Sequence, residues 1–182
     1  MLFRSRDYLL VAPSNKQRYL SVFTIEGLKA KFQGRIFFSK KVLGYVSGVA
    51  VISHSGTRVS AFVSSAGKLR RVSFDVASRG TVTGGTTIKG YASCNQDISV
   101  DVRGGFTYVY GCYGGWKNSS AAIVKYRIDG SRASKLWTKR ISGECESAIP
   151  TSNYLYLAME GSTIYNRRHD CVYSDRLVRW SI

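Results

Sequence analysis

The chain has 182 residues, of which 44% are apolar and 13% aromatic, enough to form a folded core and to exclude a wholly disordered chain. It contains 18 glycines, two prolines and no apolar run of the length that spans a membrane, a composition typical of short strands and tight turns. Its 27 basic and 11 acidic residues give a net charge of +16, which favours acidic partners. The excess is spread over residues 1–143, because residues 144–182 carry four basic and five acidic side chains.

Strand patterns run along the whole chain, whereas no stretch of ten or more residues has helical periodicity. Each pattern alternates apolar and polar residues, as a strand with one buried face does. In chain order, the expected strands are 8–12, 20–27, 35–42, 46–52, 59–63, 69–75, 81–88, 98–102, 106–110, 123–130, 135–141, 147–151, 154–158 and 177–182.

Four of these strands repeat one pattern. They begin at Leu20, Leu69, Ile123 and Leu177, so that successive copies are 49, 54 and 54 residues apart. One apolar column of the pattern is formed by Phe23, Val72, Tyr126 and Trp180. A period of about 50 residues that contains four strands is typical of a propeller blade.

We therefore expect an all-β fold, namely an arc of a β-propeller made of four sequential antiparallel four-stranded blades. The blades would span residues 6–43, 44–90, 91–143 and 144–182 of a single domain, 1–182. The first blade lacks its first strand and the last blade lacks its fourth, so we expect both to be incomplete and the chain to be truncated at both ends. A β-sandwich with accidental similarity between strands is the alternative fold.

Residues 98–111 (ISVDVRGGFTYVYG), 122–131 (AIVKYRIDGS) and 135–139 (KLWTK) resemble, in this order, the seven-bladed β-propeller repeat family known as SBBP. The similarity is good over 91–143, weaker over 44–90 and skeletal at both ends. It implies a closed propeller in the parent protein, typically extracellular, and brings no assigned catalytic residues. Pyrroloquinoline-quinone enzymes have comparable blades, but the adjacent Cys-Cys pair of that cofactor's pocket does not occur in this sequence.

Catalytic groups are scarce in the sequence. We interpret His54 as a solvated loop histidine, because no acidic residue lies near it. The cluster 167–171 contains His169, Asp170 and Cys171, but adjacent residues of an extended chain point in different directions. No His or Cys pair has the short spacing of zinc ligands. We therefore expect no catalytic residue, no cofactor and no metal; the alternative is a fragment of a propeller enzyme, quinoprotein-like or glycan-active, whose active site lies in missing blades.

Two long loops, each between the second and third strands of a blade, should emerge on one rim and carry aromatic and basic side chains. Such side chains can stack on a sugar or hold an acidic peptide. The candidate ligand-binding residues are Tyr113, Trp116, Lys117, Tyr165, Arg167 and Arg168. For Trp116 and Tyr165, packing over the end of the blade is the alternative role. We therefore expect a non-catalytic, extracellular or cell-surface binding module for a protein or an acidic glycan.

The sequence leaves two further kinds of partner open, nucleic acid and other copies of the chain. Arg71, Lys125 and Arg179 share one repeat column, which leaves a basic nucleic-acid-binding propeller as an alternative, although the sequence has no recognition motif for nucleic acid. Terminal blades should expose unpaired edges and apolar faces, so that the chain would tend to associate through them.

All four cysteines lie in the second half of the chain, without a CxxC pair. In an antiparallel blade, the start of the first strand lies beside the end of the second, which lies beside the start of the third. This arrangement predicts disulfides between Cys94 and Cys112 and between Cys145 and Cys171, and hence an oxidising compartment; plain buried thiols are the alternative. Asn118 begins a sequon for N-glycosylation, which matters in a protein secreted by a eukaryote.

Overall fold

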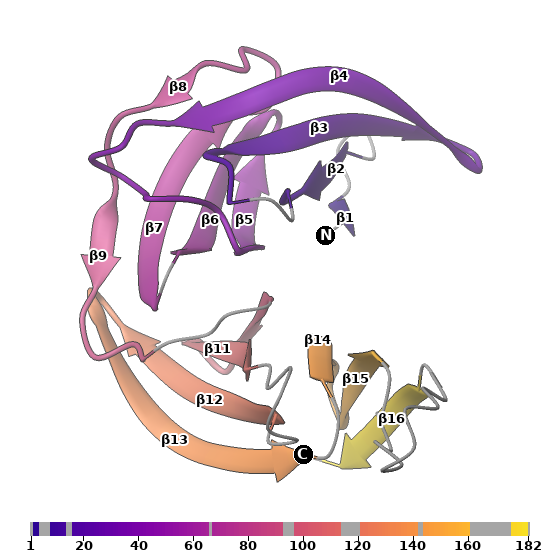
Figure 1. Ribbon diagram of the computed structural model, residues 1–182, viewed down its shortest axis with the longest axis vertical. Coiled ribbons are helices and arrows are strands. Elements are labelled where there is room, and N and C mark those ends of the chain that lie inside the picture. Colours follow the sequence, from indigo (N-terminus) through magenta and orange to yellow (C-terminus); the bar gives the residue numbers. More distant parts are fainter. Residues whose placement is uncertain are drawn as a thin grey trace, which may run out of the picture. The chain divides into compact units, whose positions relative to one another are not determined.

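The computed structural model describes residues 2–3, 8–13, 16–65, 67–92, 97–113, 121–141, 144–160 and 176–181. No helix occurs among these residues, and their strands form four sheets that follow one another along the chain (Figure 1). Contacts divide the chain into two compact units, Met1–Lys89 and Gly90–Ile182, with two sheets each. The prediction of an all-β fold of four sequential, largely antiparallel sheets is confirmed.

The first unit contains sheets A and B. Sheet A consists, in spatial order, of β1 (Leu2–Phe3), β2 (Tyr8–Val11), β3 (Tyr19–Glu26), β4 (Lys29–Phe38) and β8 (Thr81–Val82). Sheet B consists of β5 (Gly48–Ser55), β6 (Arg58–Ser65), β7 (Lys68–Asp75) and β9 (Thr86–Ile88). Neighbouring strands pair antiparallel, except that β8 pairs parallel to β4.

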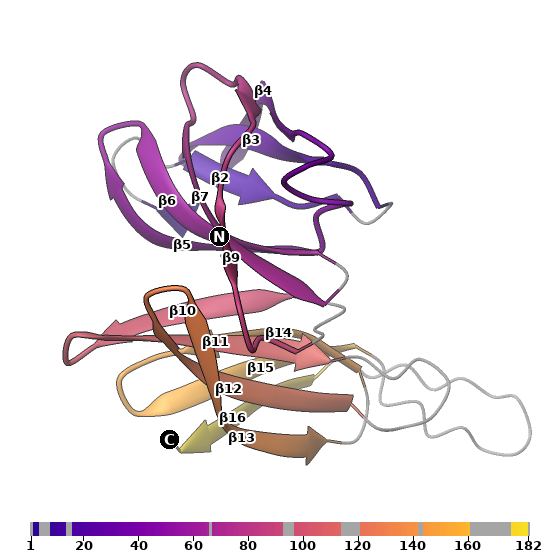
Figure 2. The ribbon, with the colours of Figure 1, turned by 90° about the vertical axis from the view of Figure 1, so that its left-hand side faces the viewer.

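The second unit contains sheets C and D, whose strands pair in chain order (Figure 2). Sheet C consists of β10 (Ile98–Arg103), β11 (Phe106–Tyr113), β12 (Ala121–Asp129) and β13 (Arg132–Ile141). Sheet D consists of β14 (Glu144–Pro150), β15 (Tyr154–Glu160) and β16 (Arg176–Ser181). Its three described strands correspond to the first three strands expected in the last blade.

The repeat found in the sequence occupies equivalent positions in the four sheets. Its apolar column lies on the third strand of each sheet, where each residue is opposite a residue of the second strand. These pairs are Phe23 with Leu9, Val72 with Ala61, Tyr126 with Val109, and Trp180 with Leu155. The period of about 50 residues is therefore the period of whole sheets.

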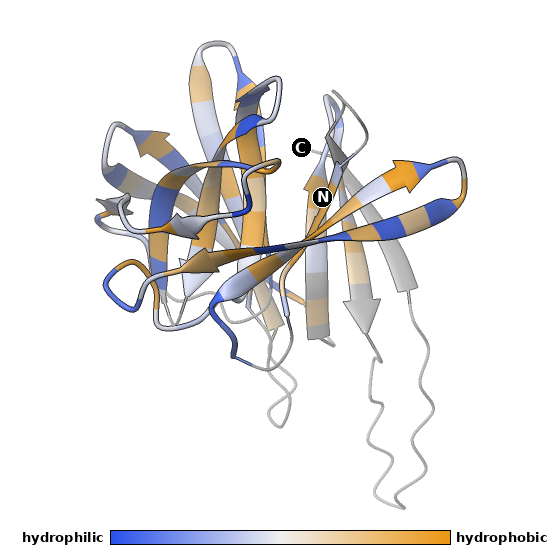
Figure 3. Cartoon of the chain, turned by 90° about the horizontal axis from the view of Figure 1, so that it is seen from above, coloured by the Kyte–Doolittle hydropathy of each residue, from blue (hydrophilic) through white to orange (hydrophobic). Residues whose placement is uncertain are grey.

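The core of the first unit lies where one face of sheet A packs against one face of sheet B. Apolar residues at alternate positions of the strands fill it, and they appear as bands between hydrophilic residues in Figure 3. Phe38 of sheet A and Phe74 of sheet B meet edge to face, with ring centroids 6.4 Å apart. Leu20 and Val22, in the first half of β3, have no exposed surface.

The structure differs from the expected strands at two places. A short strand, β1, adds a first strand to sheet A, which was expected to lack one. Residues 81–88 were expected to form one strand, but they form β8 in sheet A and β9 in sheet B. The chain leaves sheet B because Gly80 and Val82 accept backbone hydrogen bonds from Phe37 (3.3 Å) and Ser39 (3.0 Å) of the neighbouring sheet.

We predict that Leu20→Ala lowers the free energy of unfolding by about 2–5 kcal/mol, because it leaves a cavity at a fully buried position. Leu28→Ala is the matched control, since the Leu28 side chain is fully exposed in the turn between β3 and β4. Urea unfolding of both variants, followed by circular dichroism, measures the two effects. Equal losses in the two variants would contradict the assigned core.

Candidate functional site

The structure describes only part of the predicted rim site. Tyr113 ends β11 and is 40% exposed. Trp116, Lys117, Tyr165, Arg167, Arg168 and the sequon at Asn118 lie outside the described residues. The rim site and the use of the sequon therefore stay predictions.

The described cysteines are both buried in the second unit, Cys112 on β11 and Cys145 on β14. The thiol of Cys145 lies 3.7 Å from the carbonyl oxygen of Ser147, to which it donates. Cys94 and Cys171 lie outside the described residues, so both disulfide pairs stay predictions. In the part of the chain that is described, no three His, Cys, Asp or Glu side chains gather as metal ligands would.

Sheet C carries aromatic and basic side chains on one face, which we name the cation–aromatic face. Strand register brings them together, because Tyr108 is opposite Arg127, Tyr110 is opposite Lys125, and Lys125 is opposite Trp137. Residues two apart on a strand share a face. The face comprises Phe106, Tyr108 and Tyr110 of β11, Lys125 and Arg127 of β12, and Trp137 and Lys139 of β13.

Each cation of this face lies over an aromatic ring. The Lys125 ammonium is 4.6 Å from the centroid of the Tyr108 ring and 5.2 Å from that of Tyr110. The Arg127 guanidinium is 5.5 Å from the Phe106 ring, and the Lys139 ammonium is 5.6 Å from the Trp137 ring. All four distances are within the range of about 6 Å in which a cation is attracted to the ring electrons.

Burial changes across the cation–aromatic face. Tyr110 is fully buried and meets the Trp137 ring edge to face, at a centroid distance of 6.1 Å. Phe106 is 50% exposed, and the side chains of Arg127 and Lys139 are exposed. The buried rings thus support an exposed set in which aromatic surface lies beside positive charge. Such a set can stack on an apolar ring of a ligand while it pairs with an anionic group.

The outer strand of sheet C adds to the positive charge. Besides Lys139, β13 carries the exposed cations Arg132, Lys135 and Arg140 and no acidic residue. Asp101, on β10, forms an ion pair with Arg103 at 3.0 Å, which neutralises that carboxylate. Apart from Lys125, the residues of this site were not predicted from the sequence. The two-residue spacing of the aromatic residues in 106–110 and of the cations in 125–127 was the available signal.

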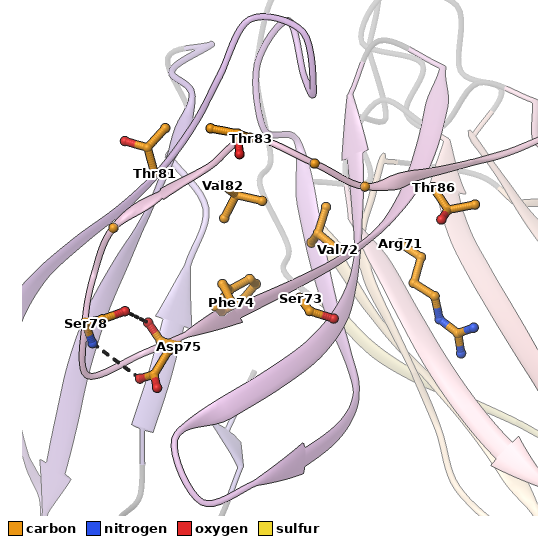
Figure 4. Close-up of a pocket in the computed structure, with 13 residues that line it drawn as sticks. Arg71, Val72, Ser73, Phe74, Asp75, Ser78, Thr81, Val82, Thr83 and Thr86 are labelled. Atoms are coloured by element: carbon orange, nitrogen blue, oxygen red, sulfur yellow. Dashed lines mark hydrogen bonds between the residues drawn. The ribbon is translucent and has the colours of Figure 1, made fainter.

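A groove of about 550 Å³ lies in the first unit, between β7 and the segment that joins β8 to β9 (Figure 4). Buried Val72, Phe74 and Val82 line it together with hydroxyl groups. The hydroxyl residues are Ser73, Ser78, Thr81, Thr83 and Thr86. The groove exists because residues 81–88 change sheets, so that β7 has no neighbour beyond Arg71 on that side.

Two observations limit what this groove can bind. Cα atoms of β7 and β8 approach within 8 Å, whereas a strand inserted between them would need about 4.8 Å on each side. The Asp75 carboxylate accepts the Ala77 N–H at 2.7 Å and the Ser78 N–H at 3.3 Å. These bonds, together with the Thr57 hydroxyl and Arg58, lower the pKa of Asp75. Asp75 therefore orders its own turn, and the cation–aromatic face is the stronger candidate site.

We predict that Gly85→Ala lowers the free energy of unfolding, because a Cβ there would lie 2.9 Å from Val72 Cγ1 and 3.0 Å from the Arg71 carbonyl oxygen. Overpacking of this kind costs about 1–3 kcal/mol. Gly84→Ala is the control, since nothing lies within 4 Å of its Cβ position. Thermal unfolding of the two variants should separate them, and a Gly85→Ala protein as stable as the Gly84→Ala protein would contradict the packing of this segment.

Asp97 connects sheets C and D. Its carboxylate accepts a hydrogen bond of 3.0 Å from the Ser147 hydroxyl on β14, and its carbonyl oxygen accepts one from the Cys112 N–H. Burial raises the pKa of the Asp97 carboxyl, although hydrogen bonds from the Ile98 N–H and the Ser147 hydroxyl offset part of the rise. The folded protein thus binds this proton more tightly than the unfolded chain does. The contribution of Asp97 to stability therefore falls as the pH rises from about 4, the unfolded value, through the folded pKa.

We predict that Asp97→Asn removes this pH dependence, since an amide does not titrate while its oxygen still accepts from Ser147. The free energy of unfolding of the variant, minus that of the wild type, should increase between pH 3 and pH 7. Asp129→Asn, at the exposed end of β12, controls for the loss of one negative charge. Urea titrations at five pH values test this, and a constant difference between Asp97→Asn and the wild type would refute it.

In comparisons with known proteins, neither a family model nor a curated protein matches this chain. The described residues include no helix of the length and apolarity needed to cross a membrane.

Proposed function

We propose that the chain is a non-catalytic, extracellular or cell-surface binding module that holds an acidic glycan on the cation–aromatic face of sheet C. The observation that carries this proposal is that the exposed ring of Phe106 and the half-buried ring of Trp137 lie beside the exposed cations Arg127 and Lys139. The resemblance of residues 98–141 to the SBBP repeat family supports the extracellular setting, because that family is typically extracellular.

The two kinds of side chain serve different parts of such a ligand. The exposed ring of Phe106 and the half-buried ring of Trp137 offer flat apolar surface, on which the C–H face of a sugar packs. Arg127 and Lys139 hold positive charge within 6 Å of these rings, where a carboxylate or sulfate group of the same sugar can form charge-assisted hydrogen bonds. A neutral glycan would use the rings alone and bind more weakly.

Charge beyond the contacts should also help binding. The net charge of +16 attracts a polyanion from a distance, and the exposed cations of β13 bring part of that charge next to the site. Exposed charges are screened by salt, so affinity should decrease as ionic strength increases.

We predict that the double variant Arg127→Ala, Lys139→Ala binds a sulfated or uronic-acid oligosaccharide at least about 10-fold more weakly than the wild type, because each lost charged hydrogen bond is worth about 1.5–3 kcal/mol. The matched control is Lys29→Ala, Lys31→Ala, which removes two exposed cations from sheet A. Its affinity should stay within about threefold, through the change in net charge alone. Isothermal titration calorimetry at low and physiological salt measures both variants.

Phe106→Ala separates ring stacking from charge, since it removes the most exposed ring of the site and leaves the net charge unchanged. It should weaken the binding of the acidic oligosaccharide and also the binding of a neutral oligosaccharide of equal length. Equal losses in the two double variants would refute the site.

Nucleic acid is the second candidate, because exposed rings beside cations can also stack bases and pair with phosphates. A single-stranded oligonucleotide that binds more tightly than any acidic glycan of similar charge would favour it over the glycan.

A further inference from the structure

The face of sheet A that points away from sheet B is apolar and partly exposed, and we name it the outer face. Val11 is 40% exposed, Phe37 46% and Phe32 52%. Strand register places further side chains beside them, because Leu9 is opposite Phe23, Phe23 is opposite Phe32, and Tyr19 is opposite Phe37. The outer face thus consists of Leu9 and Val11 of β2, Tyr19, Ser21, Phe23 and Ile25 of β3, and Ala30, Phe32, Arg35 and Phe37 of β4.

Its aromatic residues are ordered by mutual contacts. Tyr19 and Phe37 meet edge to face at 5.9 Å between centroids, and Phe23 and Phe32 do so at 5.5 Å. Arg35 lies over the Tyr19 ring at 4.5 Å, so the charged residue of this face lies along aromatic surface. Apolar surface of this extent on one sheet face is typical of an interaction site.

The repeat identifies the surfaces of the other sheets that are equivalent to the outer face. Its residues Leu9 and Val11 are equivalent to Ala61 and Val63 of sheet B, because Leu9 is opposite Phe23 as Ala61 is opposite Val72. Ala61 and Val63 are fully buried in the core between sheets A and B. The same two positions are also fully buried in sheet D, where Leu155 and Leu157 occupy them. Sheet A is therefore the exception, in which a face of this type remains exposed.

Sheet D presents the complementary surface. Tyr156 is equivalent to Leu10, which lies on the face of sheet A that covers sheet B. Tyr156 pairs with Ile149 of β14, which is 54% exposed. Tyr154 joins them on β15, with its ring centroid 6.2 Å from that of Tyr156. Sheet A covers sheet B with the face that contains Leu10, and Tyr156 lies on the equivalent face of sheet D. This face of sheet D therefore has the position in its repeat that packs on a neighbouring sheet.

We propose that the outer face of sheet A binds the face of sheet D around Ile149 and Tyr156 in a second copy of this chain. The two faces are different surfaces, so the contact is head to tail, and a third copy can add in the same way. Ile149, Tyr154 and Tyr156 on one face and Phe32 and Phe37 on the other offer apolar or aromatic surface, whose burial would drive the association. It is independent of the glycan site on sheet C.

Three variants test the proposal by sedimentation velocity over a range of concentrations. Phe32→Glu blocks the outer face and Ile149→Glu blocks the face of sheet D, whereas Leu28→Glu places the same charge on an exposed turn outside both faces. The wild type and Leu28→Glu should form dimers and larger species, and each blocked variant alone should sediment as a monomer of about 20 kDa. Circular dichroism shows whether each variant is folded, and Phe32→Ser replaces Phe32→Glu if the latter does not fold.

Mixing the two blocked variants gives the sharpest result. Each retains one intact face, so an equimolar mixture should form a dimer with one copy of each variant and nothing larger. A wild type that stays monomeric overturns the proposal. So does an Ile149→Glu protein that associates by itself, since the contact would then join two outer faces, and so does a mixture that remains monomeric.

Discussion

The structure depends on one constraint, namely that sheets A and B carry apolar residues on both faces, so that packing them on each other covers only one apolar face of each. Sheet B shows this most clearly. Val72 and Phe74 lie on one face of sheet B in the core of the first unit, and Phe62, at the opposite parity of the neighbouring strand, is also fully buried. A sheet that can cover only one face leaves about 25 cal/mol of unrealised stabilisation for every Å² of exposed apolar surface.

Sheet C departs from this rule where its outer strands carry cations. Lys125 of β12 occupies the position that is equivalent to Val22, which is fully buried in sheet A, and Arg127 is exposed two residues further along the strand. Their charges lie against aromatic rings and extend toward water, so the stems and rings pack while the charged ends stay hydrated. These few cations give part of this sheet face a surface suited to a polar ligand instead of one suited to packing against another sheet.

The strands and the repeat were predictable from the sequence, because alternation of residues such as Leu20 and Val22 is a local signal. The division of residues 81–88 was not, since it depends on hydrogen bonds to Phe37 and Ser39, more than 40 residues earlier. The cation–aromatic face was also missed. Its contacts require the register of three strands, and a bulge between Lys125 and Tyr126 shifts that register. Composition predicted a positive net charge but not where in the fold the cations gather.

The passage of β8 into sheet A has a consequence for how the first unit unfolds. The amides of Phe37 and Ser39 donate to carbonyl groups of residues that follow sheet B's third strand, so short connecting segments tie the two sheets to each other. Sheets A and B thus share backbone hydrogen bonds as well as a core, and we expect amide hydrogens of both sheets to exchange through a shared opening event. Two repeats that look autonomous in the sequence are joined by a strand of only two residues.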